Sequence, residues 1–163
     1  MAERAVTLRL ARAEDAPAMA SMSRDLIEAG LAWRYSPQRV GAMIATAETS
    51  ALVACDGALL LGFAVMQFGD EHAHLSLLCV LPPQQRRGIA RRLLAWLLES
   101  ASVAGMASVH LELRADNEAA RMFYRSCGFS ETILVPGYYE GRLAARRMVR
   151  VLRPPSPTQP CAD

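Results

Sequence analysis

The sequence lacks lysine altogether. All 18 of its basic residues are arginine, set against 16 aspartate and glutamate residues, and the formal charge is only +2. A chain this close to neutrality does not carry the extended cationic surface that nonspecific binding to nucleic-acid phosphates requires. We therefore expect no nucleic-acid partner, although a small local cluster of arginines remains compatible with the total.

Metal-binding patterns are missing as well. The four cysteines, Cys55, Cys79, Cys127 and Cys161, include no Cys-x-x-Cys pair, and the three histidines are not spaced from them as zinc ligands are. We expect free thiols and no metal.

Long apolar stretches are also absent. Nowhere do eighteen uncharged apolar residues follow one another, and the residues after Met1 are charged rather than an apolar leader with a cleavage site. These absences predict a cytoplasmic protein with no membrane partner.

The length of 163 residues suits one domain with one core. We assign this domain to residues 1–152. Residues 153–163 contain four prolines and little that could pack, so we expect a disordered proline-rich tail.

The spacing of hydrophobic residues alternates between the period of strands and the period of helices along the chain. Alternation predicts strands at residues 6–11, 52–55, 59–68 and 72–81, with helices at about 15–29 and 37–49 before the meander. The period then becomes helical over 89–104, followed by a strand at 108–114, a short helix through residue 127, and a final strand pair at 129–135 and 142–152. This order predicts an α/β (α+β) domain with a mixed, largely antiparallel sheet of six or seven strands, about four helices and a central β-α-β crossover.

The loop between residues 78 and 92 offers an anion site. Gly88 stands at a helix start, where free backbone N–H groups and the helix dipole favour an anion. Arg86, Arg87, Arg91 and Arg92 surround it, and a diphosphate suits this arrangement. The alternative is that Arg91 and Arg92 only form a solvated helix face. Against it, cations at a helix N-terminus are unfavourable unless an anion is supplied.

Two motifs in this half of the chain carry a resemblance. Gln85-x-x-Gly88-x-Ala90 resembles the Q/R-x-x-G-x-G/A pyrophosphate signature of the GNAT superfamily, the acetyl-CoA-dependent N-acetyltransferases. Asn117-x-x-Ala-x-x-x-Tyr124, on a helix that ends in Gly-Phe, resembles the second signature of that superfamily. The resemblance implies the GNAT fold and acetyl-CoA as donor.

Residues 111–129 and 136–139 look most like the bacterial ribosomal-protein alanine N-acetyltransferases. That likeness implies Glu112 as general base and Tyr124 as general acid, and it implies that the strand before Pro82 pairs with the pantetheine arm. The family's acidic residues before the final methionine are replaced here by residues 143–147. The donor-binding residues implied are Leu78, Cys79, Val80, Gln85, Arg86, Arg87, Gly88, Ile89, Ala90, Arg91, Asn117 and Tyr124.

The catalytic assignments have alternatives. Tyr124, a phenol that is protonated at neutral pH, could instead be a core aromatic beside Phe123. Glu112 could be neutralised by Arg114 or Arg121 and serve only as structure.

Residues of the strand at 72–81 offer rival chemistry. His74 and Ser76, expected on the same face as Leu78 and Val80, are rival bases or acceptor contacts. Cys79 could form an acetyl-enzyme, but alternation groups it with Leu75 and Leu77 and no basic partner is evident.

The function predicted is N-acetyl transfer from acetyl-CoA to a primary amine by direct attack in a ternary complex. A protein or peptide N-terminal amine is the first choice of acceptor and a small-molecule amine the second; a CoA-binding regulatory module without catalysis is a further alternative. A toxin acting on aminoacyl-tRNA fits the modest charge poorly. A homodimer stays open. Candidate acceptor contacts, which could equally close loop ends, are Trp33, Tyr35, His74, Tyr138 and Tyr139.

Overall fold

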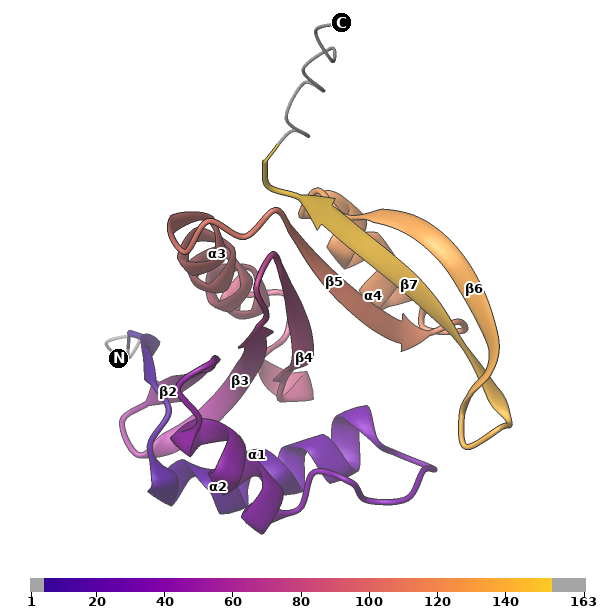
Figure 1. Cartoon of the computed structure of the whole chain (residues 1–163). Coiled ribbons are helices and arrows are strands. Elements are labelled where there is room, and N and C mark those ends of the chain that lie inside the picture. The colour runs from indigo at the N-terminus through magenta and orange to yellow at the C-terminus, as the bar shows by residue number, and fades with distance from the viewer. Residues whose placement is uncertain (1–4, 154–163) are drawn as a thin grey trace, which may run out of the picture.

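The computed structural model describes residues 5–153, so the predicted tail lies outside the described residues except for Arg153. One seven-stranded sheet runs through the molecule in the order β1-β2-β3-β4-β5-β7-β6 (Figure 1). Its strands are β1 (Thr7–Leu10), β2 (Thr49–Asp56), β3 (Leu59–Phe68), β4 (His72–Val80), β5 (Ser108–Arg114), β6 (Ser130–Tyr139) and β7 (Leu143–Val151). All neighbours pair antiparallel except β4 and β5, which are parallel. The predicted fold class is confirmed.

The helices are α1 (Ala16–Met22), α2 (Pro37–Ala45), α3 (Ile89–Val103) and α4 (Glu118–Ser126), with short turns η1 (Ala13–Asp15), η2 (Ser23–Ile27, π-helical) and η3 (Pro82–Gln84). Ser36 caps α2 by accepting a hydrogen bond from the Arg39 amide. The predicted end of this helix near residue 49 is wrong. Thr46 already has an extended backbone, and Thr49 begins β2.

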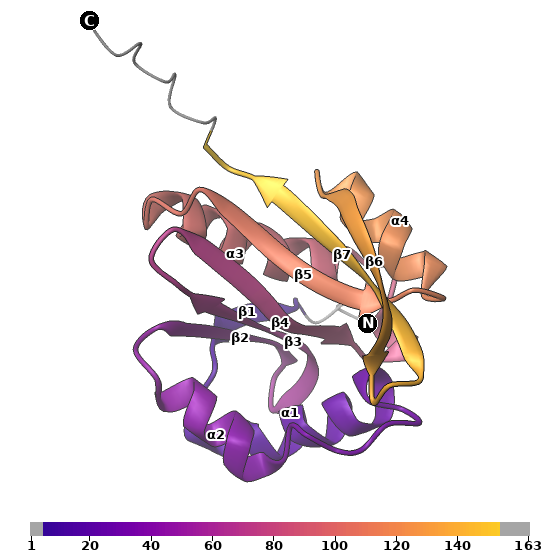
Figure 2. The same ribbon diagram turned by 45° about the vertical axis from the view of Figure 1, so that its right-hand side comes forward.

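Helices cover both faces of the sheet (Figure 2). On one face, α3 and α4 pack on buried side chains that include Leu52, Met66 and Leu111. On the other face, α1 and α2 pack on a second cluster that includes Val53 and Phe63. Because Leu52 and Val53 are neighbours on β2 and both are fully buried, the central strands are apolar on both sides.

A β-bulge in β4 changes which side chains share a face. Val65 of β3 pairs with Leu77, whereas the next residue, Met66, pairs with Leu75, so Ser76 is the extra residue. Leu75 therefore belongs to the α3 side, while Leu77 and Cys79 belong to the α1 and α2 side.

Two predicted groupings are wrong for this reason. Cys79 does not share a face with Leu75. His74 lies on the face opposite to Leu75, so it does not share a face with Leu78 and Val80, which pack with the α3-side cluster.

Strands β4 and β5 diverge after a short start (Figure 1). Their parallel pairing covers His72–His74 and Ser108–His110. Beyond that point β4 pairs only with β3, and β5 only with β7, within residues 5–153. Each strand thus has an unpaired backbone edge facing the other, and such an edge needs partners.

No helix among the described residues is long and apolar enough to cross a bilayer. The cytoplasmic location stays a prediction.

Candidate active site

The N-terminus of α3 lies at the end of β4, beside the divergence of the two strands. Its N-cap, Gly88, has a φ of +80°, a conformation that L side chains rarely adopt, and nothing lies within 4 Å of where a Cβ would stand. No side chain caps this helix and no acid lies in its first turn. The first amides of α3 are therefore left without intrahelical partners and are available to an anion.

The side chains of this loop divide into two groups. Gln85 donates a hydrogen bond to the Val80 carbonyl at 3.1 Å and so closes the loop onto β4. Arg92 lies on the opposite flank of α3, where it contacts the Val6 carbonyl of the chain entering β1 at 3.3 Å. The expected convergence of four guanidinium groups is thus wrong for Arg92.

Arg91 reaches across from α3 to α4. Its guanidinium donates to Ser126 Oγ at 2.8 Å and lies 5.8 Å from the ring centre of Phe123. Arg87 donates to Gln84 Oε1 at 2.5 Å, and Arg86 has a positive φ of 63°. Arg87 and Arg91 are therefore each held by a neighbouring side chain, and of the two only Arg91 bridges α3 and α4.

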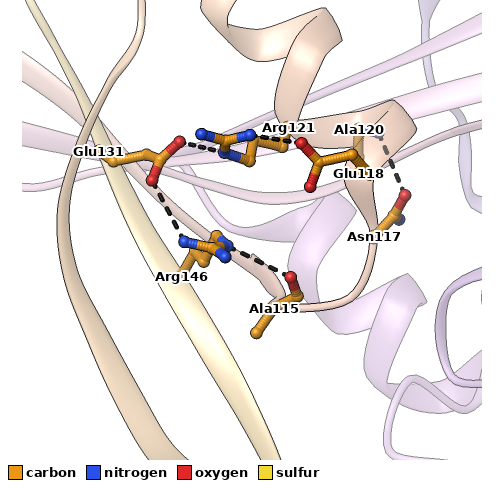
Figure 3. A network of polar contacts seen from close by, with 7 residues as sticks. All are labelled: Ala115, Asn117, Glu118, Ala120, Arg121, Glu131 and Arg146. Carbon is orange, nitrogen blue, oxygen red and sulfur yellow. Dashed lines mark hydrogen bonds and ion pairs between the residues drawn. The ribbon is translucent and has the colours of Figure 1, made fainter.

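Asn117 is the N-cap of α4, where its Oδ1 accepts from the Ala120 amide at 3.1 Å. Figure 3 shows the ion network that fixes this end of the helix. Arg121 joins Glu118 and Glu131, and Arg146 joins Glu131 and the Ala115 carbonyl. Because Arg121 is engaged here, it does not neutralise Glu112.

Tyr124 lies two turns further along α4 and is 9% exposed. Its ring packs edge-on against Phe123 and Phe129, with centroids 5.2 and 5.6 Å away. Burial raises the pKa of the Tyr124 phenol, and the nearby Cys127 and Cys79 add to the shift. The phenol is thus firmly protonated and close to a residue of β4.

Glu112 lies on β5 with its side chain 15% exposed. Its Oε2 is 2.5 Å from His74 Nε2, and its Oε1 is 3.3 Å from Arg147 Nε on β7. The hydrogen bond from His74 is the largest cause that lowers the Glu112 pKa below its usual value; burial opposes it and Arg147 adds to it.

The partner predicted for Glu112 from β5 itself is also wrong. The Arg114 guanidinium points to the α1–α2 connection instead, donating to the Ile27 and Ala29 carbonyls at 2.9 and 2.6 Å.

Segments far apart in the sequence come together opposite Glu112. The Ala32 amide donates to Glu140 Oε1 at 2.7 Å, and Arg142 donates to the Gly30 carbonyl at 3.3 Å. These contacts and those of Arg114 hold the α1–α2 connection against β5 and the β6–β7 hairpin.

A buried carboxylate shapes the same connection from inside. Glu28, 6% exposed, accepts hydrogen bonds from the Arg34 amide at 2.6 Å, the Tyr35 amide at 3.2 Å and Ser23 Oγ at 2.9 Å. It therefore fixes the backbone that carries Tyr35.

The predicted acceptor residues separate into two places. Tyr138 and Tyr139 stack edge-on with centroids 4.9 Å apart. The Arg147 guanidinium carbon lies 6.0 Å from the centre of the Tyr138 ring. Burial, with Glu112 and Tyr35 adding to it, raises the pKa of Tyr138 and raises that of Tyr139 to about 12. Trp33 instead lies against α1, where its indole donates to the Ala20 carbonyl at 3.2 Å.

Cys79 is a poor nucleophile in this setting. Burial raises the pKa of its thiol to about 12, so the thiolate that an acetyl-enzyme requires is scarce at neutral pH. Tyr124 is the nearby residue that interacts with it, and that residue is itself a protonated acid.

Three residues that matter here were missed from the sequence: Arg147, Glu28 and Gln67. Arg147 pairs with Glu112 through the β5–β7 register, and a lone carboxylate within a helical pattern gave no hint that Glu28 turns inward. Gln67 accepts from Ser76 at 2.8 Å, next to the bulge that sequence alternation did not reveal.

Comparisons with known proteins identify the family of this chain. The model of the acetyltransferase (GNAT) family matches residues 18–129. The ribosomal protein bS18-alanine N-acetyltransferase of Escherichia coli (strain K12) is 39% identical over 77 residues, 47% of this chain and 52% of that protein. The N-alpha-acetyltransferase RimI of Mycobacterium tuberculosis is 50% identical over 58 residues, 36% of this chain and 35% of that protein.

Similarity in three dimensions extends further along the chain. The crystal structure of the ribosomal-protein-S18-alanine N-acetyltransferase from Escherichia coli superposes with a TM-score of 0.80 at 26% identity, covering 95% of this chain and 99% of the other. In sequence, however, the chain spans about half the length of the first curated relatives it matches.

Proposed function

The chain belongs to the acetyltransferase (GNAT) family, and on that premise we propose that it transfers an acetyl group from acetyl-CoA to a primary amine. The observation that carries this proposal is the divergence of β4 and β5. At one end lies the uncapped start of α3, suited to a diphosphate, and across it lie Glu112 and Tyr124, suited to proton transfer.

The donor would lie along the unpaired edge of β4. Its diphosphate would bind the first amides of α3, Ile89, Ala90 and Arg91, together with the guanidinium groups of Arg86, Arg87 and Arg91. Its pantetheine arm would pair with the backbone of Leu78, Cys79 and Val80. Tyr124 and Asn117 would contact it from α4.

The reaction then needs no covalent enzyme intermediate. The acceptor ammonium gives a proton to the Glu112 carboxylate. The neutral amine then attacks the thioester carbon, so that a C–N bond forms and the C–S bond breaks. A backbone N–H of β4 polarises the carbonyl oxygen as negative charge develops on it. Tyr124 gives its proton to the leaving sulfur, and the second proton, which the nitrogen loses as the amide forms, restores the phenol directly or through water.

The acceptor we propose is the N-terminal amine of a protein or peptide. The similar proteins named above act on such an amine. Tyr35, Tyr138 and Tyr139 lie opposite Glu112, and Glu112 offers a carboxylate to an ammonium group. This arrangement would suit a peptide that enters N-terminus first, with aromatic rings against its first side chains.

The experiment is an assay of free CoA thiol release with a panel of peptides of different N-termini beside a panel of small amines. We expect release with peptides and little release with polyamines, amino acids or amine drugs. A Tyr124→Phe variant should lower kcat by about 100-fold while acetyl-CoA affinity is kept. The control is His72→Gln. His72 lies on the same sheet face as His74 but outside the site.

Results of that assay separate the alternatives. Faster release with small amines would move the acceptor to that class. Tight acetyl-CoA binding without acetyl transfer to any amine would make the protein a CoA-binding module, and a Tyr124→Phe enzyme with full turnover would remove Tyr124 as acid.

A further inference from the structure

We propose that His74 is a positioning residue that works with Glu112 as one proton-accepting pair and passes the acceptor's proton to solvent. This inference rests on the function proposed above. It concerns how that site removes a proton from the acceptor. The evidence for it is a chain of polar contacts from Gln67 to Arg147.

The chain runs across four strands, β3, β4, β5 and β7, and includes the bulge. Ser76, the bulged residue of β4, donates to Gln67 Oε1 at 2.8 Å. His74 Nδ1 lies 3.2 Å from Ser76 Oγ, and His74 Nε2 lies 2.5 Å from Glu112 Oε2. The bulge is what brings the Ser76 hydroxyl beside the imidazole.

This chain determines which ring nitrogen carries a proton. The Ser76 hydroxyl has one proton and donates it to Gln67, so toward His74 it can only accept. His74 Nδ1 must therefore carry a proton. In a neutral imidazole the other nitrogen, Nε2, then has a lone pair aimed at Glu112.

A lone pair and a carboxylate oxygen cannot face each other at 2.5 Å without a proton between them. The geometry therefore corresponds to the loaded pair, in which an imidazolium donates to a carboxylate. The unloaded pair is a neutral imidazole beside the same carboxylate, and this is the state that can accept a proton.

In this setting the Glu112 carboxylate is a weak base. Its pKa is lowered, first by the hydrogen bond from His74, so the carboxylate itself holds a proton poorly. The imidazole supplies the missing proton affinity, because in the unloaded pair its Nε2 lone pair faces Glu112 Oε2 at hydrogen-bond distance. The proton therefore ends on His74.

The charged and titratable groups facing the pair come from every neighbouring element. Glu112 interacts with His110 on β5, Arg147 on β7, and Tyr138 and Tyr139 on β6. One step further away, His72 on β4 interacts with His110, and Arg34 and Tyr35 on the α1–α2 connection interact with the tyrosines. Arg147 is the cation in direct contact with Glu112, and it opposes protonation of the carboxylate.

The step balances without a co-reactant. An N–H bond of the acceptor ammonium breaks, the proton passes through Glu112 Oε2, and an Nε2–H bond forms on His74. The amine keeps its electron pair and attacks the thioester. The His74 side chain, 43% exposed against 15% for Glu112, then gives the proton to water.

The test is the pH dependence of kcat/KM in His74→Gln, with His72→Gln as the control, using one peptide acceptor throughout. Glutamine can still donate a hydrogen bond to Glu112 but does not titrate. We expect kcat/KM to fall at least about tenfold at pH 8. The ratio of variant to wild type should rise as pH falls, because a proton from solvent can load the wild-type pair, whereas the variant has no imidazole to load.

The acceptor's own amine titrates identically in all enzymes, so it cancels in that ratio. A flat ratio would mean that His74 only supports the structure and would overturn the proposal. The double variant His74→Gln/Glu112→Gln should lose about as much activity as Glu112→Gln alone, because the two residues act as one unit. Multiplied losses would contradict a single pair.

A second readout needs no activity. Ring ¹⁵N spectra of His74 at a pH above the acidic limb should place its proton on Nδ1, and Ser76→Ala should shift it toward Nε2. A proton on Nε2 in the wild-type protein would overturn the assignment. If no amine accepts acetyl, the proposed function fails while these spectra still decide whether the pair exists.

Discussion

The two ends of the candidate site use different binding groups, backbone amides at one end and side chains at the other. At the α3 end, the binding groups are backbone amides beside Gly88, contributed by a short continuous segment. At the Glu112 end, the groups are side chains of β4, β5 and β7 and a connection held by contacts such as that of Arg114 with the Ala29 carbonyl, 85 residues away. A backbone site depends on local conformation, whereas a side-chain site depends on long-range packing, and substitutions should affect them differently.

The largest effect is expected at the backbone end. Gly88→Val should reduce acetyl-CoA affinity by at least about 100-fold, because a β-branched residue at φ +80° is strained and would move the amides that bind the diphosphate. Titration calorimetry measures the acetyl-CoA affinity of the variant and of the wild type. Gly105, at the other end of α3, also has a φ of +80° with nothing within 4 Å of a Cβ, so Gly105→Val carries the same strain away from the site. Equal affinity loss in both would attribute the effect to helix stability alone.

A smaller and different effect is expected at the side-chain end. Glu28→Gln weakens the acceptors of the Arg34 and Tyr35 amides and should loosen the acceptor side, raising KM for a peptide by about tenfold and lowering stability by about 1 kcal/mol. Acetyl-CoA affinity should stay within twofold. Steady-state kinetics and donor titration measure the two, with Glu48→Gln on an exposed turn as control. A matching loss of donor affinity would show that the two ends are not separable.

A still smaller effect is expected at Cys79. Cys79→Ala should leave kcat within about threefold of wild type, because the thiol is protonated and, in the proposed complex, the donor would pair with the Cys79 backbone. Cys55→Ala, at another buried cysteine on β2, is the matched control. Loss of turnover in the first variant alone, with acetyl-CoA binding intact, would restore the acetyl-enzyme alternative.

The smallest effect concerns stability. The pKa of Glu112 is lower in the folded protein than its ordinary value of 4.5. Its ionised form therefore stabilises the fold above that pH, and the contribution is lost as pH falls through the lowered pKa. Glu112→Gln should therefore cost stability at pH 7, and its deficit against wild type should shrink below about pH 4.5. Urea unfolding at pH 7 and pH 4 measures this. A deficit that does not change with pH would mean that Glu112 contributes through packing.

The same division decides how much could be predicted from the sequence. The strand at 108–114 and the helix from Ile89 were predicted with their bounds nearly correct, because each has a clear period and a glycine or cap at its end. The start of α3 at Gly88 was predicted as well, since its residues are consecutive; that it binds an anion stays a prediction. The roles of the predicted donor and catalytic residues stay predictions.

The Glu112 end resisted prediction for physical reasons. One extra residue, Ser76, interrupts the alternation of β4 and moves His74 away from the face of Leu78. The partner of Glu112 could not be found within β5 or α4 because it comes from the β5–β7 register, which brings Arg147 opposite Glu112. Pattern analysis sees one strand at a time, and these contacts join several.

The short parallel ladder between β4 and β5 has a mechanical consequence. It joins a half-sheet of four strands to one of three through three residue pairs. A donor bound between the two half-sheets would contact both of them. A ligand that binds only the native state adds RT ln(1 + [L]/Kd) to the free energy of unfolding of the protein. The supply of acetyl-CoA would then govern how long the enzyme survives as well as how fast it works.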